Sequence, residues 1–214
     1  MSAVLETILE TGIVAIVRSD SASGLIETVR ALSAGGVRAV EVTMTTPRAL
    51  EAIAAAAGEA DGRYIIGAGS VLDAAAADAA IDAGAEFLVA PNVCVEAIEL
   101  AKARGKVICP GALTPTEIAA AWKARADAVK VFPASHFGAA YLEAILAPMP
   151  HLRLMPVGGV NLENAAAFIR AGACALGVGG SLVNTQTIAR GDWPAISDAA
   201  ARYVQTVAAA RAEG

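Results

Sequence analysis

The stretch Asp127-Ala-Val-Lys-Val-Phe-Pro-Ala-Ser135 places one charged side chain in the middle of a short apolar run. The valines and the bounding aspartate and proline predict a short buried strand. Side chains alternate along a strand, so Lys130 and Phe132 share one face while Val129 and Val131 share the other. A lysine ammonium inside a core must be paired, lose its proton or take part in chemistry as an amine. The interpretation of the whole chain therefore depends on Lys130.

Helices are predicted on both sides of this stretch. Thr114-Pro-Thr-Glu117 has the pattern of a capping box with proline at the first helical position, and residues 139–146 predict the helix that follows. The alternation of strand and helix extends over the chain, after a leading helix at about residues 2–10. Besides the lysine stretch, strands are expected at Ile13–Val17, Val37–Val42, Tyr64–Gly69, Glu86–Ala90, Val107–Cys109, Leu152–Val157 and Ala175–Val178.

Capping residues and glycines mark the other helices. These are expected from the Ser/Asp cluster at 19–23 to Gly35-Gly36, from Pro47 to Gly58, from Asp73 to Gly84, up to Gly105, from Asn161-Leu-Glu-Asn164 to Gly172, and from Trp193 to about Arg211. Eight short apolar strands that alternate with helices indicate a parallel sheet covered by helices. The pattern favours an α/β fold, a single (β/α)8 TIM barrel over residues 1–214, and a doubly wound sheet is the alternative.

Composition excludes several classes of protein. With 56% hydrophobic and 17% charged residues, the 214-residue chain is not a disordered one. A net charge of −5 without a basic run argues against nucleic-acid binding. No apolar stretch has membrane-spanning length, and the N-terminus lacks the features of a signal peptide, so we expect a cytoplasmic protein. Three cysteines in apolar segments predict reduced thiols, and two histidines without partners at ligand spacing predict no metal site.

Reactive residues gather where the predicted strands end, which is the active-site end of such a barrel. They are Arg18, Glu41, Thr43, Thr45, Ser70, Asn92, Lys130 and the glycine pairs Gly158-Gly159 and Gly179-Gly180. Glu41 is either a general acid/base or a carboxylate that only neutralises Lys130. Lys130 is either a nucleophilic amine or a structural buried lysine. Arg18 is either an anion-binding side chain or a solvated loop residue.

The two glycine pairs follow the last two predicted strands, where this fold commonly binds phosphate. Glycines let backbone N–H groups approach an anion closely, although tight turns require glycine as well. The residues alone thus leave three readings open. They are a lysine-dependent enzyme acting on a phosphorylated substrate, a barrel isomerase or epimerase, and a non-catalytic barrel that binds a sugar phosphate.

Several motifs carry a family resemblance from about Ile13 to Val183. They are Gly35-Gly-Val37, Val40-Glu-Val-Thr43, Ile66-Gly-Ala-Gly-Ser-Val71, Pro110-Gly111, Thr114-Pro-Thr-Glu117, Val129-Lys-Val-Phe-Pro133, Pro156-Val-Gly-Gly-Val160 and Val178-Gly-Gly-Ser181. Together they resemble the bacterial 2-keto-3-deoxy-6-phosphogluconate and 2-keto-3-deoxy-6-phosphogalactonate aldolases, a family that includes 4-hydroxy-2-oxoglutarate aldolases.

This resemblance implies a class I, metal-independent aldolase without a cofactor, usually a trimer, that acts on pyruvate and a phosphorylated keto acid. Lys130 matches the Schiff-base lysine of the family, Glu41 its general acid/base and Phe132 an aromatic residue that lines the site. Ser70 matches a threonine that helps to hold the pyruvoyl carboxylate. The phosphate site is matched by Gly158, Gly159, Gly179, Gly180 and Ser181.

The chain departs from the gluconate-type pattern at two positions. Thr45 stands where many members have a carboxylate-binding arginine, so Arg18 is expected to carry more of that role. Val157 precedes Gly-Gly where gluconate-type enzymes tend to have threonine; this valine, Pro91-Asn92 and Ser135–Tyr141 look like the galactonate type. The galactonate epimer is therefore the predicted substrate. The gluconate epimer and 4-hydroxy-2-oxoglutarate are the alternatives, and an isomerase or epimerase is a more distant one.

Overall fold

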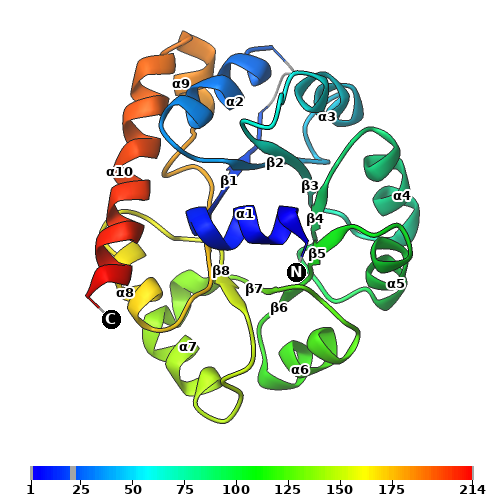
Figure 1. Cartoon of the computed structure of the whole chain (residues 1–214), viewed down its shortest axis with the longest axis vertical. Coiled ribbons are helices and arrows are strands. Elements are labelled where there is room, and N and C mark those ends of the chain that lie inside the picture. Colours follow the sequence, from blue (N-terminus) through cyan, green and yellow to red (C-terminus); the bar gives the residue numbers. More distant parts are fainter. Residues whose placement is uncertain (1, 20–22, 214) are drawn as a thin grey trace.

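The computed structural model describes residues 2–19 and 23–213, in which strands and helices alternate (Figure 1). The strands are β1 (Ile13–Val17), β2 (Ala39–Thr43), β3 (Ile65–Gly69), β4 (Phe87–Val89), β5 (Val107–Cys109), β6 (Gly111–Ala112), β7 (Val129–Val131), β8 (Leu154–Pro156) and β9 (Leu176–Val178). The helices are α1 (Ala3–Thr11), α2 (Leu25–Ala34), α3 (Ala49–Gly58), α4 (Ala74–Asp82), α5 (Val95–Ala103), α6 (Pro115–Lys123), the 3-10 helix η1 (Ala134–His136), α7 (Gly138–Leu146), α8 (Ala165–Arg170), α9 (Thr185–Arg190) and α10 (Trp193–Ala212).

The strands pair in parallel throughout. Six form one sheet in the order β5-β4-β3-β2-β1-β9, and three form another in the order β6-β7-β8. Pro110 separates β5 from β6, and an isolated parallel bridge between Val157 and Gly177 joins the region after β8 to β9. Figure 1 shows the strands curling around a centre with the helices outside them. The predicted α/β class with a parallel sheet is confirmed.

Local sequence signals place most helix ends correctly. The Thr114 side chain accepts a hydrogen bond from the Glu117 N–H, and the Glu117 carboxylate accepts one from the Thr114 N–H, which completes the predicted capping box. Asp73 caps α4 by accepting from the N–H of Ala76. Some expected boundaries were wrong: the strand expected at 152–157 is shorter, because apolar runs extend beyond the residues that pair in the sheet. The predicted helix start at 19–23 includes residues 20–22, which lie outside the described residues.

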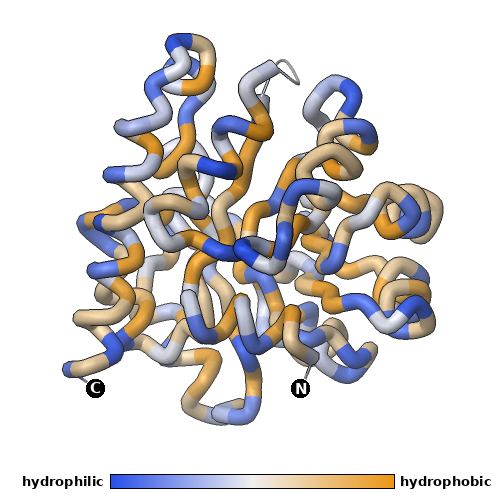
Figure 2. Tube along the Cα trace, turned by 45° about the horizontal axis from the view of Figure 1, so that its top comes forward, coloured by the Kyte–Doolittle hydropathy of each residue, from blue (hydrophilic) through white to orange (hydrophobic). Residues whose placement is uncertain are grey.

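Two apolar layers hold the elements together. One lies between the strands and the outer helices, along which hydrophobic and hydrophilic residues alternate (Figure 2). The other lies among the strands, where Phe87 and Met155 pack with Leu5 and Ile8 of α1. A Cβ on Gly67 would lie 2.4 Å from the Phe87 ring, so only glycine fits there. Helix α1 thus closes the end of the sheet where the strands begin (Figure 1).

Within the described part of the chain, none of the helices combines the length and the apolar character that a membrane crossing requires.

Candidate active site

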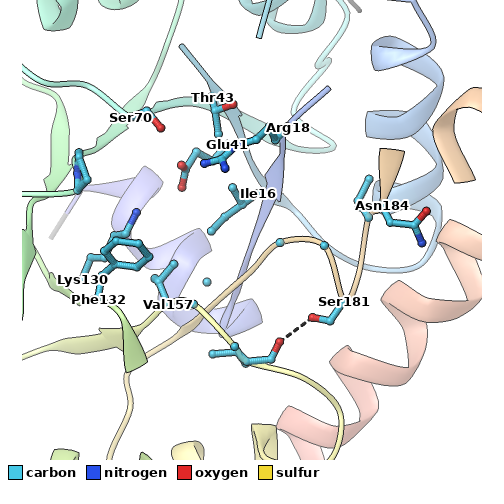
Figure 3. Close-up of a pocket in the computed structure, with 18 of the residues that line it drawn as sticks. Ile16, Arg18, Glu41, Thr43, Ser70, Lys130, Phe132, Val157, Ser181 and Asn184 are labelled. Atoms are coloured by element: carbon cyan, nitrogen blue, oxygen red, sulfur yellow. Dashed lines mark hydrogen bonds between the residues drawn. The ribbon is translucent and has the colours of Figure 1, made fainter. Parts of the chain in front are cut away.

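A pocket of about 550 Å³ lies at the opposite end, where the strands finish (Figure 3). Its lining includes every predicted site residue except Thr45 and Asn92. The predicted residues that line it are Arg18, Glu41, Thr43, Ser70, Lys130, Phe132, Val157, Gly158, Gly159, Gly179, Gly180 and Ser181. Six different strands or following loops therefore deliver these residues to one place, as expected of a curled parallel sheet.

Lys130 enters the pocket from the middle of β7, level with Gly111 of β6 and Met155 of β8. Lys130 is buried, with only 7% of its surface exposed. The Nζ atom lies 4.9 Å from the centroid of the Phe132 ring, and Phe132 is exposed to the pocket on the outer side. An aromatic face at this distance is a favourable neighbour for the ammonium form and shields it from bulk water. The lysine amine is thus held at the inner wall of the pocket.

Glu41 lies in the middle of β2, level with Ile16 of β1 and Gly67 of β3. It is 1% exposed, and its Oε2 atom has no hydrogen-bond partner in the described structure. A Cβ on Gly69 would lie 1.6 Å from the other carboxyl oxygen, so the glycine makes room for the carboxyl group. The two glycines of the Gly-Ala-Gly motif are therefore required by different neighbours: Gly69 makes room for the Glu41 carboxyl group, and Gly67 makes room for the Phe87 ring.

Electrostatics give Glu41 a proton affinity suited to proton transfer. Burial raises the pKa of its carboxyl to about 7, against the opposing influence of the positive charges of Lys130 and Arg18. Figure 3 shows the Lys130 amine and the Glu41 carboxyl directed into the same pocket. Among the residues that the structure describes, no ion pair joins these two groups. The carboxyl group is therefore able to gain or lose a proton near neutral pH.

Polar side chains from three strand ends surround the carboxyl group. The Thr43 hydroxyl lies in the pocket wall, 3.1 Å from that of Thr45 and 3.2 Å from that of Thr46. Thr45 itself is exposed and does not line the pocket; its hydroxyl group contacts the hydroxyl group of Thr43 instead. Ser70 follows β3 with a φ of 58°, a left-handed conformation that is uncommon without glycine and is typical of functional sites. The exposed Arg18 side chain lies at the pocket rim.

The loops after β8 and β9 form the remaining wall. Gly158 and Gly159 have φ values of 88° and 75°, whereas Gly180 has an ordinary φ and its added Cβ would meet nothing within 4 Å. In the described part of the chain, the backbone N–H groups of Gly159, Gly180 and Ser181 donate no hydrogen bond. Backbone N–H groups are normally paired unless solvent or a ligand satisfies them. This wall therefore supplies donors for an anion.

Comparison with known proteins decides the family. A family model described as "KDPG and KHG aldolase" matches residues 4–199. The chain belongs to the KDPG and KHG aldolase family. It is 36% identical over 171 residues to the 2-dehydro-3-deoxy-6-phosphogalactonate aldolase of Escherichia coli (strain K12), which covers 79% of this chain and 83% of that relative. It is 34% identical over 210 residues to the 2-dehydro-3-deoxy-phosphogluconate aldolase of Treponema pallidum (strain Nichols), at 97% and 99% coverage.

A solved structure described as "Native KDPGal structure" matches with a TM-score of 0.87 and 33% identity, covering 94% of this chain and 96% of that chain. The resemblance inferred from the motifs is confirmed, and the chain is an aldolase, a carbon–carbon lyase.

Sequence reasoning missed part of the wall of the aldolase pocket. The additional lining residues are Ile16, Pro91, Val160, Asn161, Gly177, Val183, Asn184 and Thr185. Asn184 caps the unpredicted helix α9 by accepting from the N–H of Thr187, and Gly191 ends that helix in a left-handed conformation. These two capping residues are visible in the sequence and could have predicted α9. Asn92, which was expected at the site, does not line the pocket.

The described residues contain no group of three or more His, Cys, Asp or Glu side chains arranged to hold a metal ion.

Proposed function

We propose that this aldolase cleaves a 2-keto-3-deoxy-6-phospho sugar acid reversibly to pyruvate and D-glyceraldehyde 3-phosphate by Schiff-base chemistry. One observation carries the proposal: a buried lysine amine and a buried carboxyl oxygen without a partner share one pocket. The pocket size suits a six-carbon substrate, because small-molecule sites have volumes of about 300–1,000 Å³. The wall with unpaired N–H groups suits its phosphate end.

Lys130 acts as the nucleophile. The neutral amine attacks the C2 ketone, and the carbinolamine loses water to give an iminium ion. Glu41, directly or through a water molecule, removes the proton of the C4 hydroxyl group. The C3–C4 bond then breaks, its electron pair passes into the iminium to form an enamine, and the aldehyde leaves. The enamine takes up a proton at C3, and hydrolysis of the resulting imine releases pyruvate and the free amine.

Other lining residues are assigned to binding. Ser70, Thr43 and the guanidinium group of Arg18 hold the carboxylate of the pyruvoyl part, and Thr45 steadies Thr43. Phe132 covers the lysine from the side of solvent. The phosphate group binds at the loops that contain Gly158, Gly159, Gly179, Gly180 and Ser181.

The galactonate epimer is the proposed substrate. Val157 lines the pocket on the side of Lys130 and Phe132 (Figure 3), so an apolar side chain lies where a hydroxyl group would recognise the other epimer. The kcat/KM values for the two 6-phosphorylated epimers test this, and Val157→Thr is expected to shift their ratio toward the gluconate epimer. A large preference of the unaltered enzyme for the gluconate epimer would contradict the assignment.

The architecture proposed for the whole chain is a single closed (β/α)8 barrel that assembles as a homotrimer. The bridge between Val157 and Gly177 supports closure of the barrel. Assembly is supported by the family and by two exposed apolar side chains near the pocket end, Leu72 (59% exposed) and Val95 (44%). Light scattering coupled to size-exclusion chromatography tests the trimer. The cytoplasmic location stays a prediction from the sequence.

Borohydride trapping with pyruvate, followed by peptide mapping, tests the chemistry most directly. A reduced pyruvate adduct on Lys130 is expected. Glu41→Gln should still form this adduct while turnover falls by about 10²- to 10⁴-fold, the usual contribution of a general acid/base. A folded wild-type enzyme without an adduct would contradict the Schiff-base mechanism and favour the isomerase or epimerase reading. Unchanged turnover of Glu41→Gln would contradict the role of Glu41.

A further inference from the structure

A single hydroxyl group links the two loops that form the anion-binding wall. The Ser181 Oγ, after β9, donates a hydrogen bond of 2.6 Å to the carbonyl oxygen of Val160, after β8 (Figure 3). Asn164 restrains the first loop only internally, by donating to the carbonyl oxygen of Gly159. Past the strand ends, the described structure contains no other hydrogen bond between the two loops. The spacing of the unpaired N–H groups therefore depends on the orientation of the Ser181 side chain.

That orientation is set from outside the pocket. The hydroxyl of Tyr203, on α10, donates to the Ser181 Oγ at 3.0 Å. Tyr203 is 1% exposed and does not line the pocket, and α10 packs against α2 and α8. A serine hydroxyl has one proton to donate, so the acceptor side of Ser181 faces Tyr203 and its proton goes to Val160. Burial raises the pKa of the Tyr203 phenol, which keeps it a donor at neutral pH.

We propose that Tyr203 is a positioning residue for substrate phosphate. It fixes the Ser181 hydroxyl and thereby the spacing of the two loops whose N–H groups bind the phosphate dianion. The inference rests on the proposed function, because it assumes that the phosphate of the substrate occupies this wall. It does not involve the carbon–carbon bond chemistry, which takes place at Lys130 and Glu41. Loss of the phenol should therefore weaken phosphate recognition and leave the chemistry intact.

Tyr203→Phe tests the proposal, with Tyr64→Phe as the matched control. Tyr64 is also buried, and its hydroxyl donates to the carbonyl oxygen of Ala56, away from the pocket. Tyr203→Phe is expected to raise the Kd for inorganic phosphate and the KM for the phosphorylated substrate about three- to tenfold, the usual value of one hydrogen bond. The kcat, and the KM for unphosphorylated 4-hydroxy-2-oxoglutarate, should stay unchanged. Tyr64→Phe should change none of these quantities.

Ser181→Ala supplies the second part of the test. If Tyr203 acts through Ser181, the double variant should bind inorganic phosphate no more weakly than Ser181→Ala alone. Additive losses, an unchanged phosphate Kd in Tyr203→Phe, or equal losses for phosphorylated and unphosphorylated substrates would each overturn the proposal. The phosphate Kd needs no turnover. If the wild type forms no pyruvate adduct, the proposed chemistry fails while the phosphate measurement still decides the role of Tyr203.

Discussion

The two ends of the curled parallel sheet meet different demands. At the closed end, Leu5, Ile8 and Phe87 pack with the strand residues around them, and each of these side chains is buried in an apolar layer. At the open end, the Glu41 carboxyl and the Lys130 amine are buried side chains without an ion-pair partner among the described residues. Burying such groups is unfavourable unless they are paired. The closed end therefore supplies stability, and the open end gives up stability for the proposed chemistry.

The largest expected effect is that of Lys130→Met. Turnover should fall on the order of 10⁴- to 10⁶-fold, as when other enzymes lose their nucleophile. The free energy of unfolding should stay the same or rise by about 1 kcal/mol, because an apolar side chain replaces a buried amine that has no salt bridge. Steady-state kinetics and urea unfolding measure the two quantities. Substantial turnover in the variant would remove Lys130 from the chemistry.

Lys102→Met is the matched control for this comparison. Lys102 contacts both carboxyl oxygens of Asp127 at 2.8 Å near the closed end. Its loss should lower the free energy of unfolding by about 1–3 kcal/mol, because Asp127 is left partly buried without its cation. Turnover per folded molecule should not change. Comparison of the two lysine variants thus separates an effect on turnover, at the open end, from an effect on the free energy of unfolding, at the closed end.

The next effect concerns the closed end itself. Leu5→Ala should lower the free energy of unfolding by about 2–5 kcal/mol, because it leaves a cavity where α1 covers the strands. The kcat and KM of the folded variant should equal those of the wild type. Val4, only half-buried on the same helix, gives a milder control as Val4→Ala. A large fall in kcat at full folding would show that packing at the closed end controls the geometry of the pocket.

A smaller effect follows from the pKa of Glu41. Its carboxyl has a pKa of about 7 in the folded protein against an ordinary value of 4.5, so the native state binds more protons than the unfolded state between these pH values. The free energy of unfolding should therefore fall as the pH rises from about 4.5 to 7, by up to about 3 kcal/mol.

Urea unfolding of wild type and Glu41→Gln across this pH range measures the effect. The wild type should lose stability relative to the variant as the pH rises. Glu27→Gln, at an exposed position of α2, controls for the change in net charge. Parallel pH profiles for wild type and Glu41→Gln would mean that burial does not raise the pKa of the Glu41 carboxyl group.

The sequence predicted what depends on local pattern. Apolar runs located the strands. Lys130 and Glu41 are unusual already in the sequence, because each is a single charged residue inside such a run. Thr45 was placed in the site because strand ends converge there, yet whether a loop residue faces inward depends on how the chain turns after β2. The resemblance predicts Ser181 at the phosphate site, and the structure adds that its hydroxyl donates to the carbonyl oxygen of Val160. Unpaired N–H groups and the contact with Tyr203 depend on tertiary structure, which no local pattern encodes.

The smallest expected effect separates two glycines of the pocket wall that the loops after β8 and β9 form. Gly159 has a φ of 75°, and an added Cβ would lie 2.3 Å from the Ser135 Cβ, so Gly159→Ala should lower the free energy of unfolding by about 1–3 kcal/mol. Gly180 has neither constraint, and Gly180→Ala should leave stability unchanged or raise it by about 0.4–1 kcal/mol. The fold thus explains the first glycine and not the second.

The proposed phosphate site would account for Gly180, because an added methyl group would compete for space with a phosphate bound at the N–H groups of Gly180 and Ser181. Gly180→Ala should therefore raise the KM for the phosphorylated substrate about tenfold, close to 1.4 kcal/mol, without raising the KM for an unphosphorylated one. Gly58→Ala, at the end of α3 where an added Cβ also meets nothing within 4 Å, is the control for an unconstrained glycine far from the pocket. If Gly180→Ala and Gly58→Ala behave alike with the phosphorylated substrate, phosphate does not bind against Gly180, and the absence of a side chain there needs another cause.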